Sequence, residues 1–355
     1  MNQPETAGVR RVGRRRPSGP GPAATTDRSR AYRRLVNPFE PPRIYSDDQV
    51  AAIHDAALRV LETQGMKVLS APARRRYAAG GAMVDEATQV VRIDRALVAQ
   101  ALATTPSEFT FHAGNPEFNV AIGGRNVCFA PTSGPPNAMD TLHGRRAGTL
   151  EDFANFMKLT QSFEVLHTLG GSVEPQDVPV HLRHYEFMRW QVLLTDKVPF
   201  LYARGSAQIA DCLEVLQIAH GLTREELRRH PYVWTVINTN SPLQLDIPMA
   251  EGIIDFAAAG QVLIITPFTL AGAMAPVTVA GALTLAHAEA LACITLAQRV
   301  NPGTPILYGS FTSNVDMKSG SPAFGTPEYA KAAFGAGQLA RRIGVPWRCS
   351  SATAG

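Results

Sequence analysis

The 355-residue sequence predicts an α/β fold of the TIM (β/α)8-barrel type, preceded by a smaller helical α+β cap. From about Asn126, short apolar runs alternate with longer helical runs, the order expected for parallel strands joined by crossover helices. The strand segments are apolar almost without interruption, as in a sheet covered on both faces. A regular period over seven such segments favours a barrel over an open, doubly wound sheet.

The first third of the sequence predicts the cap. Ser46 begins a helix with a capping box that includes Gln49, and the helix ends at Gly65. Two shorter helices are expected near residues 71–77 and 94–104. The stretch FTFHAGNPEFNVAIGG indicates β structure. Its Gly123 and Gly124 lack the spacing of a nucleotide-binding glycine motif and predict a hairpin turn instead.

The rest of the sequence predicts the barrel. Its strands are expected at NVCFAP, VLHTLGG, PFLYAR, YVWTVIN, VLIITPF, PILYGS and VPWRCS. Helices are expected at residues 150–161, 181–195, 207–221, 248–260, 279–300 and 327–344, with a short turn at residues 223–229. The sequence stops just past the seventh strand, so the barrel lacks its last strand and helices. We expect a fragment, a truncated product, or half of an assembly that closes another way. The predicted regions are a disordered basic tail (1–38), the α+β cap (39–125) and an incomplete catalytic barrel (126–355).

Charge and cysteine content exclude several functions. The net charge of +4 arises from arginines before residue 35, so the rest is mildly acidic and predicts no nucleic-acid groove. The arginine-rich start indicates a disordered tail or a weak contact for an acidic partner, and no apolar run follows it as a signal sequence requires. Cys128, Cys212, Cys293 and Cys349 are widely separated and indicate reduced thiols in the cytoplasm.

The residues from Phe256 to Ala288 contain no Asp, Glu, Lys or Arg. Pro267 and Pro276, with two glycines, interrupt the run, which argues against a membrane span. We expect a strand, an apolar loop over TLAGAMAPVTVAG and then a crossover helix. Because loops after strands form the functional rim of a barrel, this loop is expected to contact a large apolar group or another protein.

The segment FTLAGAMAPVTVAGALTLAHAEALA resembles the central signature of the trimethylamine methyltransferase family, whose corrinoid-dependent members demethylate methylamines or quaternary amines. The segments INTNSPLQLD, PILYGSFTSNVDMKSGSPAFGTPEYA and DDQVAAIHDAALRVLETQGMKV are similar to the same family. The resemblance covers about residues 40–355 and implies a TIM barrel. Family members extend beyond the point where this sequence ends, and the trimethylamine-specific enzymes carry pyrrolysine in that region. The ending PWRCSSATAG more closely resembles the relatives without pyrrolysine.

The resemblance implies a methylated amine as substrate and a corrinoid protein as partner; this chain itself binds no cofactor. Without pyrrolysine, a quaternary amine such as a betaine is expected rather than trimethylamine, because a quaternary ammonium leaves as a neutral amine without being protonated. The tasks of the protein are then positioning and desolvation, and no catalytic acid or base is assigned. The expected location is the cytoplasm, and a homo-oligomer is left open.

The expected substrate-binding residues lie near the carboxyl ends of strands. Aromatic faces bind quaternary ammonium groups at about 0.5–2 kcal/mol per contact. The main aromatic candidates are Phe268, Tyr308, Phe311, Trp234 and Tyr202, with Phe129 and Trp347 as further ones. Arg204, Asn238 and Asn240 are candidates for a betaine carboxylate. Each has a structural alternative: core packing for the aromatics, a turn for the asparagines with Ser241, and an ion pair with a carboxylate for Arg204.

Other chemistries have weaker support. His181 and His184 lie three residues apart with Glu186 nearby, but no cysteine is spaced to join them and an outer helix faces away from a barrel site, so no metal is expected. Asp316 and Lys318 indicate a salt bridge on the rim. A quaternary-amine-binding barrel without turnover, or an inactive truncated homologue, is the alternative function. A Schiff-base lyase or aldolase is a third, for which Lys197 and Lys318 are poorly placed.

Overall fold

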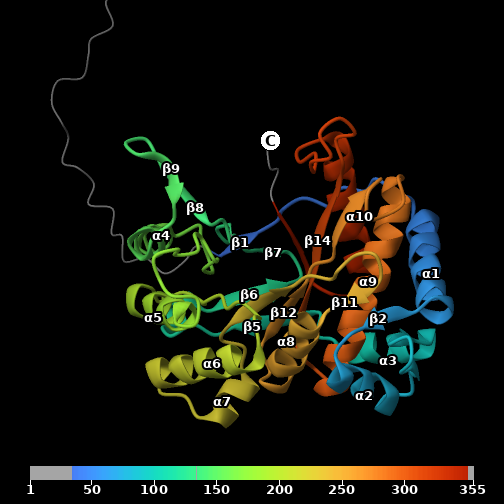
Figure 1. Cartoon of the computed structure of the whole chain (residues 1–355), viewed down its shortest axis with the longest axis horizontal. Coiled ribbons are helices and arrows are strands. Elements are labelled where there is room, and N and C mark those ends of the chain that lie inside the picture. The colour runs from blue at the N-terminus through green and yellow to red at the C-terminus, as the bar shows by residue number, and fades with distance from the viewer. Residues whose placement is uncertain (1–33, 133, 351–355) are drawn as a thin grey trace, which may run out of the picture. The chain divides into compact units, whose positions relative to one another are not determined.

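The computed structural model of the protein describes residues 34–132 and 134–350 (Figure 1). The predicted basic tail therefore lies almost entirely outside the described residues. The last part of its range is the strand β1 (Leu35–Val36), which pairs antiparallel with β7 (Asn126–Val127). The chain then runs to α10, where the Gln338 side chain accepts from the Ile44 and Tyr45 amides and donates to the Tyr45 carbonyl.

The three helices predicted for the cap are confirmed, and Ser46 and Gln49 form the predicted capping box at the start of α1. The cap elements are α1 (Asp47–Thr63), β2 (Met66–Val68), α2 (Ala71–Ala79), β3 (Met83–Asp85), β4 (Val90–Arg92), α3 (Arg95–Thr104), β5 (Glu108–Phe111), the 3-10 turn η1 (Pro116–Phe118) and β6 (Val120–Gly123). The paired hairpin is β5–β6. Gly123 and Gly124, both with positive φ, instead turn the chain from β6 into β7.

The second part alternates strands and helices from Trp234 onward, as predicted. Its elements are β8 (Asn137–Asp140), β9 (Gly144–Ala147), α4 (Leu150–Ser162), α5 (Arg183–Leu194), α6 (Ser206–His220), α7 (Arg224–Arg229), β10 (Trp234–Ile237), β11 (Gln244–Leu245), α8 (Ile247–Ala258), β12 (Val262–Ile265), β13 (Phe268–Ala271), α9 (Val279–Val300), β14 (Ile306–Asn314), α10 (Pro327–Arg342) and β15 (Trp347–Cys349). The helices α4 to α7, in contrast, follow one another with only single bridges where two strands were predicted. The β8–β9 hairpin was not predicted, and Figure 1 shows it projecting beside α4.

The strands lie side by side in chain order. β10, β12, β14 and β15 are neighbours in one parallel sheet. Two single parallel bridges extend this sheet to the second and third predicted strands: Thr168 pairs with Val198, and Phe200 pairs with Trp234. The first predicted strand lies next to the second, because the His167 amide donates to the Phe129 carbonyl. Within the described parts of the chain, no backbone hydrogen bond joins β15 back to that first strand, and the predicted lack of a last barrel strand stays a prediction.

The uncharged run, Phe256 to Ala288, covers the end of α8, the strands β12 and β13, and the first part of α9. α9 is the one helix of the described residues that is long and apolar enough to cross a membrane, yet it is buried in the protein core between α1, α3, α8 and α10. One prediction for this run was wrong. The expected loop begins inside β13, because the chain resumes pairing after Pro267 and Phe268 lies opposite Phe311 on β14. β14 consequently extends to Asn314, beyond its predicted end at Ser310.

The sheet has two buried faces. Side chains of Ile237, Ile265, Ile306 and Tyr308 pack with α8, α9 and α10 on the side that we call the helix face. Side chains of Trp234, Ile264 and Leu307 lie on the opposite side, the inner face, with Phe200 and Leu169 of the preceding strands. The helix-face core also includes cap residues of α1 and β2, so one core continues across the predicted cap boundary.

Candidate functional site

Three rows of side chains succeed each other on the inner face toward the carboxyl ends of the strands. Ile264 and Leu307 are register neighbours and form an apolar row. Two residues further along, Thr266 adjoins Gly309, which pairs with Arg348 of β15. Two residues beyond these, Phe268 pairs with Phe311. Since a strand advances about 3.3 Å per residue, successive rows lie roughly 6–7 Å apart.

The outermost row is an aromatic pair that the sequence predicted. The rings of Phe268 and Phe311 stack with centroids 5.0 Å apart and planes 29° from parallel. Phe324 continues the group, with its ring centroid 5.2 Å from that of Phe311. All three side chains are partly exposed. Part of each ring therefore remains accessible at the edge of the sheet, and aromatic rings suit a quaternary ammonium group.

The middle row contains an arginine that the sequence reasoning missed. Arg348 is half-buried, and its guanidinium makes no hydrogen bond or ion pair with any residue in the described part of the chain. Burial lowers the pKa of Arg348 from its ordinary value, but a guanidinium of this kind stays charged. A buried cation without a counter-ion is costly, so this position favours an anionic ligand. The signal in the sequence was an arginine inside the apolar strand VPWRCS.

The floor between Thr266 and Arg348 is kept free of side chains by Gly309. A Cβ placed on Gly309 would lie 1.9 Å from Thr266 Oγ1, closer than any side chain permits. Thr266 Oγ1 is itself buried and has no hydrogen-bond partner among the residues described. Asn238 follows β10 beside this row and is exposed. The row therefore offers a guanidinium, a hydroxyl and an amide around bare backbone.

Tyr308 lies away from this site. Tyr308 lies three positions before Phe311, and because this spacing is odd it faces the helices. Its hydroxyl is 2.9 Å from His287 Nδ1, and only 2% of its surface is exposed. His287 Nε2 in turn lies 2.8 Å from Nδ1 of His54 on α1. Burial raises the pKa of Tyr308 and holds that of His287 well below its usual range. Trp347, the register partner of Tyr308, also faces the helices.

Arg204 forms the ion pair with a carboxylate that was expected as its structural alternative. Its guanidinium binds both carboxylate oxygens of Glu174 and lies 4.2 Å from the ring centroid of Tyr202. Glu174 also accepts from Arg183 at 3.0 Å, and the pKa of Glu174 is lowered, chiefly by Arg204. Tyr202 and these three charged residues line a pocket of about 240 Å³. Because Glu174 already compensates Arg204, the guanidinium of Arg204 is less available to a further carboxylate than that of Arg348.

The other predicted residues have structural surroundings. Trp234 is 3% exposed and its ring centroid is 4.7 Å from that of Phe200, in the core of the inner face. Asn240 forms a turn, since its Oδ1 accepts from the Asp246 amide at 3.1 Å and its own amide donates to the Gln244 carbonyl. The structure thus brings together Phe268, Phe311 and Asn238 around one sheet edge, and it places Tyr308, Trp234 and Asn240 elsewhere.

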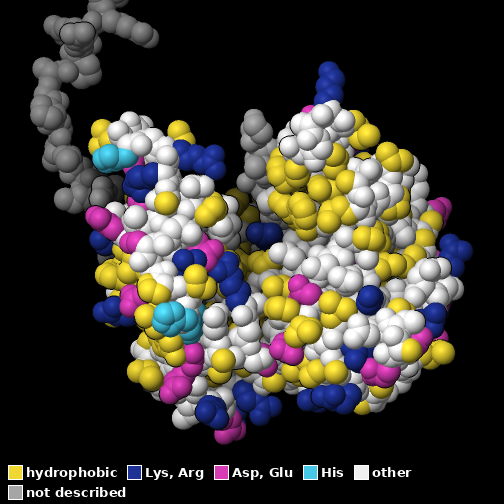
Figure 2. All heavy atoms as spheres, viewed as in Figure 1, with side chains coloured by type: hydrophobic (Ala, Val, Ile, Leu, Met, Phe, Trp, Pro, Cys, Tyr) yellow, Lys and Arg dark blue, Asp and Glu magenta, His cyan; other side chains and the backbone are white. Residues whose placement is uncertain are grey.

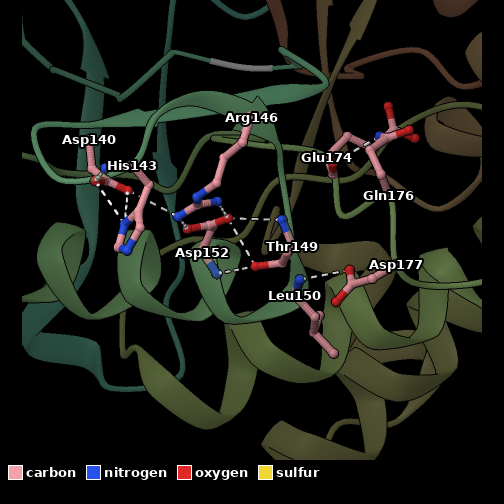
Figure 3. Close-up of polar contacts among 9 residues, drawn as sticks. All are labelled: Asp140, His143, Arg146, Thr149, Leu150, Asp152, Glu174, Gln176 and Asp177. Atoms are coloured by element: carbon pink, nitrogen blue, oxygen red, sulfur yellow. Dashed lines mark hydrogen bonds and ion pairs between the residues drawn. The ribbon is translucent and has the colours of Figure 1, made fainter.

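A polar network joins the base of the β8–β9 hairpin to the start of α4 (Figure 3). Arg146 of the β8–β9 hairpin binds Asp152 and Asp140, and Asp152 also caps α4 together with Thr149. The same Arg146 contact strongly lowers the pKa of Asp152. The Leu150 amide donates to Asp177 at 2.9 Å, which attaches the loop carrying Glu174 to the start of α4. The hairpin base and this loop therefore form one fixed unit.

The histidines considered for a metal have other contacts. His184 lies 3.1 Å from Asp211, Trp190 donates to Glu186, and His181 is exposed before α5. Across residues 34–132 and 134–350, no cluster of three or more His, Cys, Asp or Glu side chains could hold a metal ion.

Comparisons with known proteins agree with the resemblance seen in the sequence. The family model described as Trimethylamine methyltransferase (MTTB) matches residues 10–355. A glycine betaine methyltransferase of Desulfitobacterium hafniense strain Y51 is 38% identical over 306 residues, covering 86% of this chain and 63% of the relative. Trimethylamine methyltransferase MttB of D. hafniense strain DSM 10664 / DCB-2 is 30% identical over 308 residues, covering 85% of this chain and 61% of the relative. The chain thus spans less than two thirds of the length of these relatives.

Solved structures support the fold. The hydroxylamine complex of MtmB aligns with a TM-score of 0.52 and 11% identity, covering 86% of this chain and 67% of that one. The Methanosarcina barkeri monomethylamine methyltransferase MtmB aligns with a TM-score of 0.51 and 12% identity, at the same coverage. At this identity the likeness concerns the fold alone.

Proposed function

Because this chain belongs to the trimethylamine methyltransferase family, we propose that it transfers a methyl group from a betaine, a quaternary ammonium compound with a carboxylate, to a corrinoid protein. The observation that carries the proposal is the uncompensated Arg348 one row below the Phe268–Phe311 pair. A zwitterion satisfies both features, since its carboxylate needs a cation and its ammonium needs aromatic faces.

The proposed pose follows the rows of the inner face. The carboxylate of the substrate binds Arg348 and accepts from Thr266 or Asn238, over the bare backbone of Gly309. The trimethylammonium group lies against Phe268 and Phe311 at the outer edge. The spacing of roughly 6–7 Å between rows suits a molecule with only one or two carbons between its charges. A methylated amine without a carboxylate would leave Arg348 uncompensated.

The reaction is a displacement at the methyl carbon. A Co(I) corrinoid carried by the partner would supply the electron pair for the methyl carbon, and the electrons of the broken carbon–nitrogen bond would return to nitrogen. A quaternary ammonium therefore leaves as a neutral tertiary amine, and no proton has to be supplied. The residues of this chain hold the ammonium at the open edge, exclude water and restrict its orientation.

The edge of the sheet offers a surface for the partner. Val277 and Met317, in the loops that follow β13 and β14, are 79% and 84% exposed. Figure 2 shows apolar side chains gathered on the part of the protein that carries β14 and α10, next to a notch in the surface. We propose that the corrinoid protein covers this edge. The proposed location is the cytoplasm, and a homo-oligomer is compatible with this arrangement.

Incubation of the protein with cob(I)alamin and glycine betaine, choline or trimethylamine tests the proposal, with the demethylated amine quantified by NMR. We expect dimethylglycine from glycine betaine and little product from the other two. Product from trimethylamine without product from either quaternary amine would contradict the proposal. Calorimetric binding of glycine betaine without product, also when a corrinoid protein is supplied, would favour the alternative of a binding barrel without turnover.

A further inference from the structure

Glu289 is a buried acid in the middle of α9 that the proposed reaction does not use. Its side chain has no exposed surface. Glu289 Oε2 accepts from the hydroxyls of Thr239, at 2.5 Å, and Ser241, at 2.7 Å, and Oε1 accepts from the Leu243 amide at 2.7 Å. Both carboxylate oxygens are thus directed at a single segment, the loop from Thr239 to Leu243 that joins β10 to β11.

No cation in the described part of the chain compensates Glu289. Burial raises the pKa of Glu289, the three hydrogen bonds oppose that rise, and no lysine, arginine or histidine of the described chain forms an ion pair with it. A buried carboxylate is costly unless hydrogen bonds satisfy it, and here all of them come from the loop. The acid and the loop therefore hold each other in one geometry, because moving either would leave buried polar groups unpaired.

The loop leads directly from the candidate site. Asn238, which precedes Thr239, stands beside the row of Thr266, Gly309 and Arg348. At its other end the loop enters β11, which pairs with β2 of the cap, and the Lys67 amide donates to the Leu243 carbonyl. A displacement of the loop would move Asn238 relative to Arg348, whereas the strand β10 itself is held by β12.

We propose that Glu289 is a positioning residue for substrate binding: through Thr239, Ser241 and Leu243 it fixes Asn238 where the amide meets the carboxylate of the substrate. This inference rests on the proposed function. Geometry rather than charge is the requirement, because a glutamine could accept from the Leu243 amide and donate to the two hydroxyl oxygens. Glu289→Gln is therefore the conservative variant, and Glu289→Ala removes the support.

The test is calorimetric titration of glycine betaine into the wild-type protein and the variants, with thermal unfolding to check that each is folded. We expect Glu289→Ala and Asn238→Ala each to raise the Kd about tenfold, the double variant to be no weaker than Asn238→Ala, and Glu289→Gln to stay within threefold of wild type. Thr295→Val is the matched control, since Thr295 is buried on α9 and bonds only the Leu291 carbonyl of its own helix. Its Kd should not change.

Where Glu289→Ala does not fold, Thr239→Val removes one support from the loop side and should raise the Kd by a smaller factor. Equal affinity in wild type and all folded Glu289 and Thr239 variants would overturn the inference while leaving the proposed function intact. Strictly additive effects of Glu289→Ala and Asn238→Ala would also overturn it, because Glu289 would then act independently of Asn238. A wild-type protein that binds no betaine would overturn the proposed function and this inference together.

Discussion

Replacement of Arg348 by methionine should have opposite effects on ligand affinity and on protein stability. Methionine keeps much of the side-chain length and removes the charge. Hydrogen bonds to charged groups contribute about 1.5–3 kcal/mol each, so loss of one such contact to a carboxylate should raise the Kd for glycine betaine about 10- to 150-fold. Choline has the same trimethylammonium group and no carboxylate, so its Kd should change less than about threefold.

The stability effect follows from the surroundings of Arg348. Because the half-buried guanidinium has no counter-ion among the residues described, its removal should increase the free energy of unfolding by about 1 kcal/mol. Arg204→Met is the matched control. This substitution removes the ion pair between Arg204 and Glu174, and Glu174 remains paired with Arg183. It should lower the free energy of unfolding slightly and leave the affinity for glycine betaine within threefold of wild type.

The assay is calorimetric titration with glycine betaine and choline, combined with urea unfolding of each variant. An equal loss of affinity for both ligands in Arg348→Met would refute the assignment of Arg348 to the carboxylate. A large loss for glycine betaine in Arg204→Met, with none in Arg348→Met, would assign the carboxylate to Arg204 instead. The ratio of the Kd values of the wild-type protein for glycine betaine and choline provides the reference.

Three further predictions concern the rows and the core beneath them. Phe311→Ala should raise the Kd for both quaternary amines about 2- to 30-fold, the equivalent of about 0.5–2 kcal/mol, whereas Tyr308→Phe should leave both unchanged because its hydroxyl contacts His287 on the helix face. The reverse pattern in the titrations would show that the two faces are misassigned. Gly309→Ala should destabilise the protein by about 1–3 kcal/mol through its clash with Thr266 Oγ1, and Thr266→Ala in the same chain should recover part of that loss in urea unfolding. Additive costs in that double variant would exclude the clash. Burial lowers the pKa of His287 well below 6.5, so His287 is neutral in the folded protein and protonates more readily in the unfolded chain. Its contribution to the free energy of unfolding is therefore complete above about pH 6.5 and declines by up to about 1.4 kcal/mol per pH unit below that pH. The free energy of unfolding should therefore fall less between pH 7.5 and 5.5 in His287→Gln than in wild type, and equal losses would contradict the neutral state.

Much of the secondary structure followed from local signals in the sequence. Ser46 with Gln49, Thr149 with Asp152 and Gly221 mark helix ends because their side chains or backbone freedom satisfy unpaired groups within a few residues. The start of α9 was also a local signal, because Pro276 precedes the helix and Thr278 caps it. The length of β14 was not predictable, because its last residues pair with β13 from a different segment of the chain.

The candidate site likewise combines features that the sequence predicts with features that only the tertiary structure determines. In the structure only Asn238 follows the end of a strand, since Phe268 begins β13 and Phe311 lies within β14. The sequence alone could select all three residues because each follows an apolar run, which is a local property. It could not tell that Tyr308 faces α9 while Phe311 faces inward, since the side of a sheet depends on register and not on residue type. Nor could it tell that Glu174 occupies Arg204 and leaves Arg348 without a counter-ion. Charge compensation is settled between residues distant in sequence, so only the tertiary structure decided which arginine can receive a ligand.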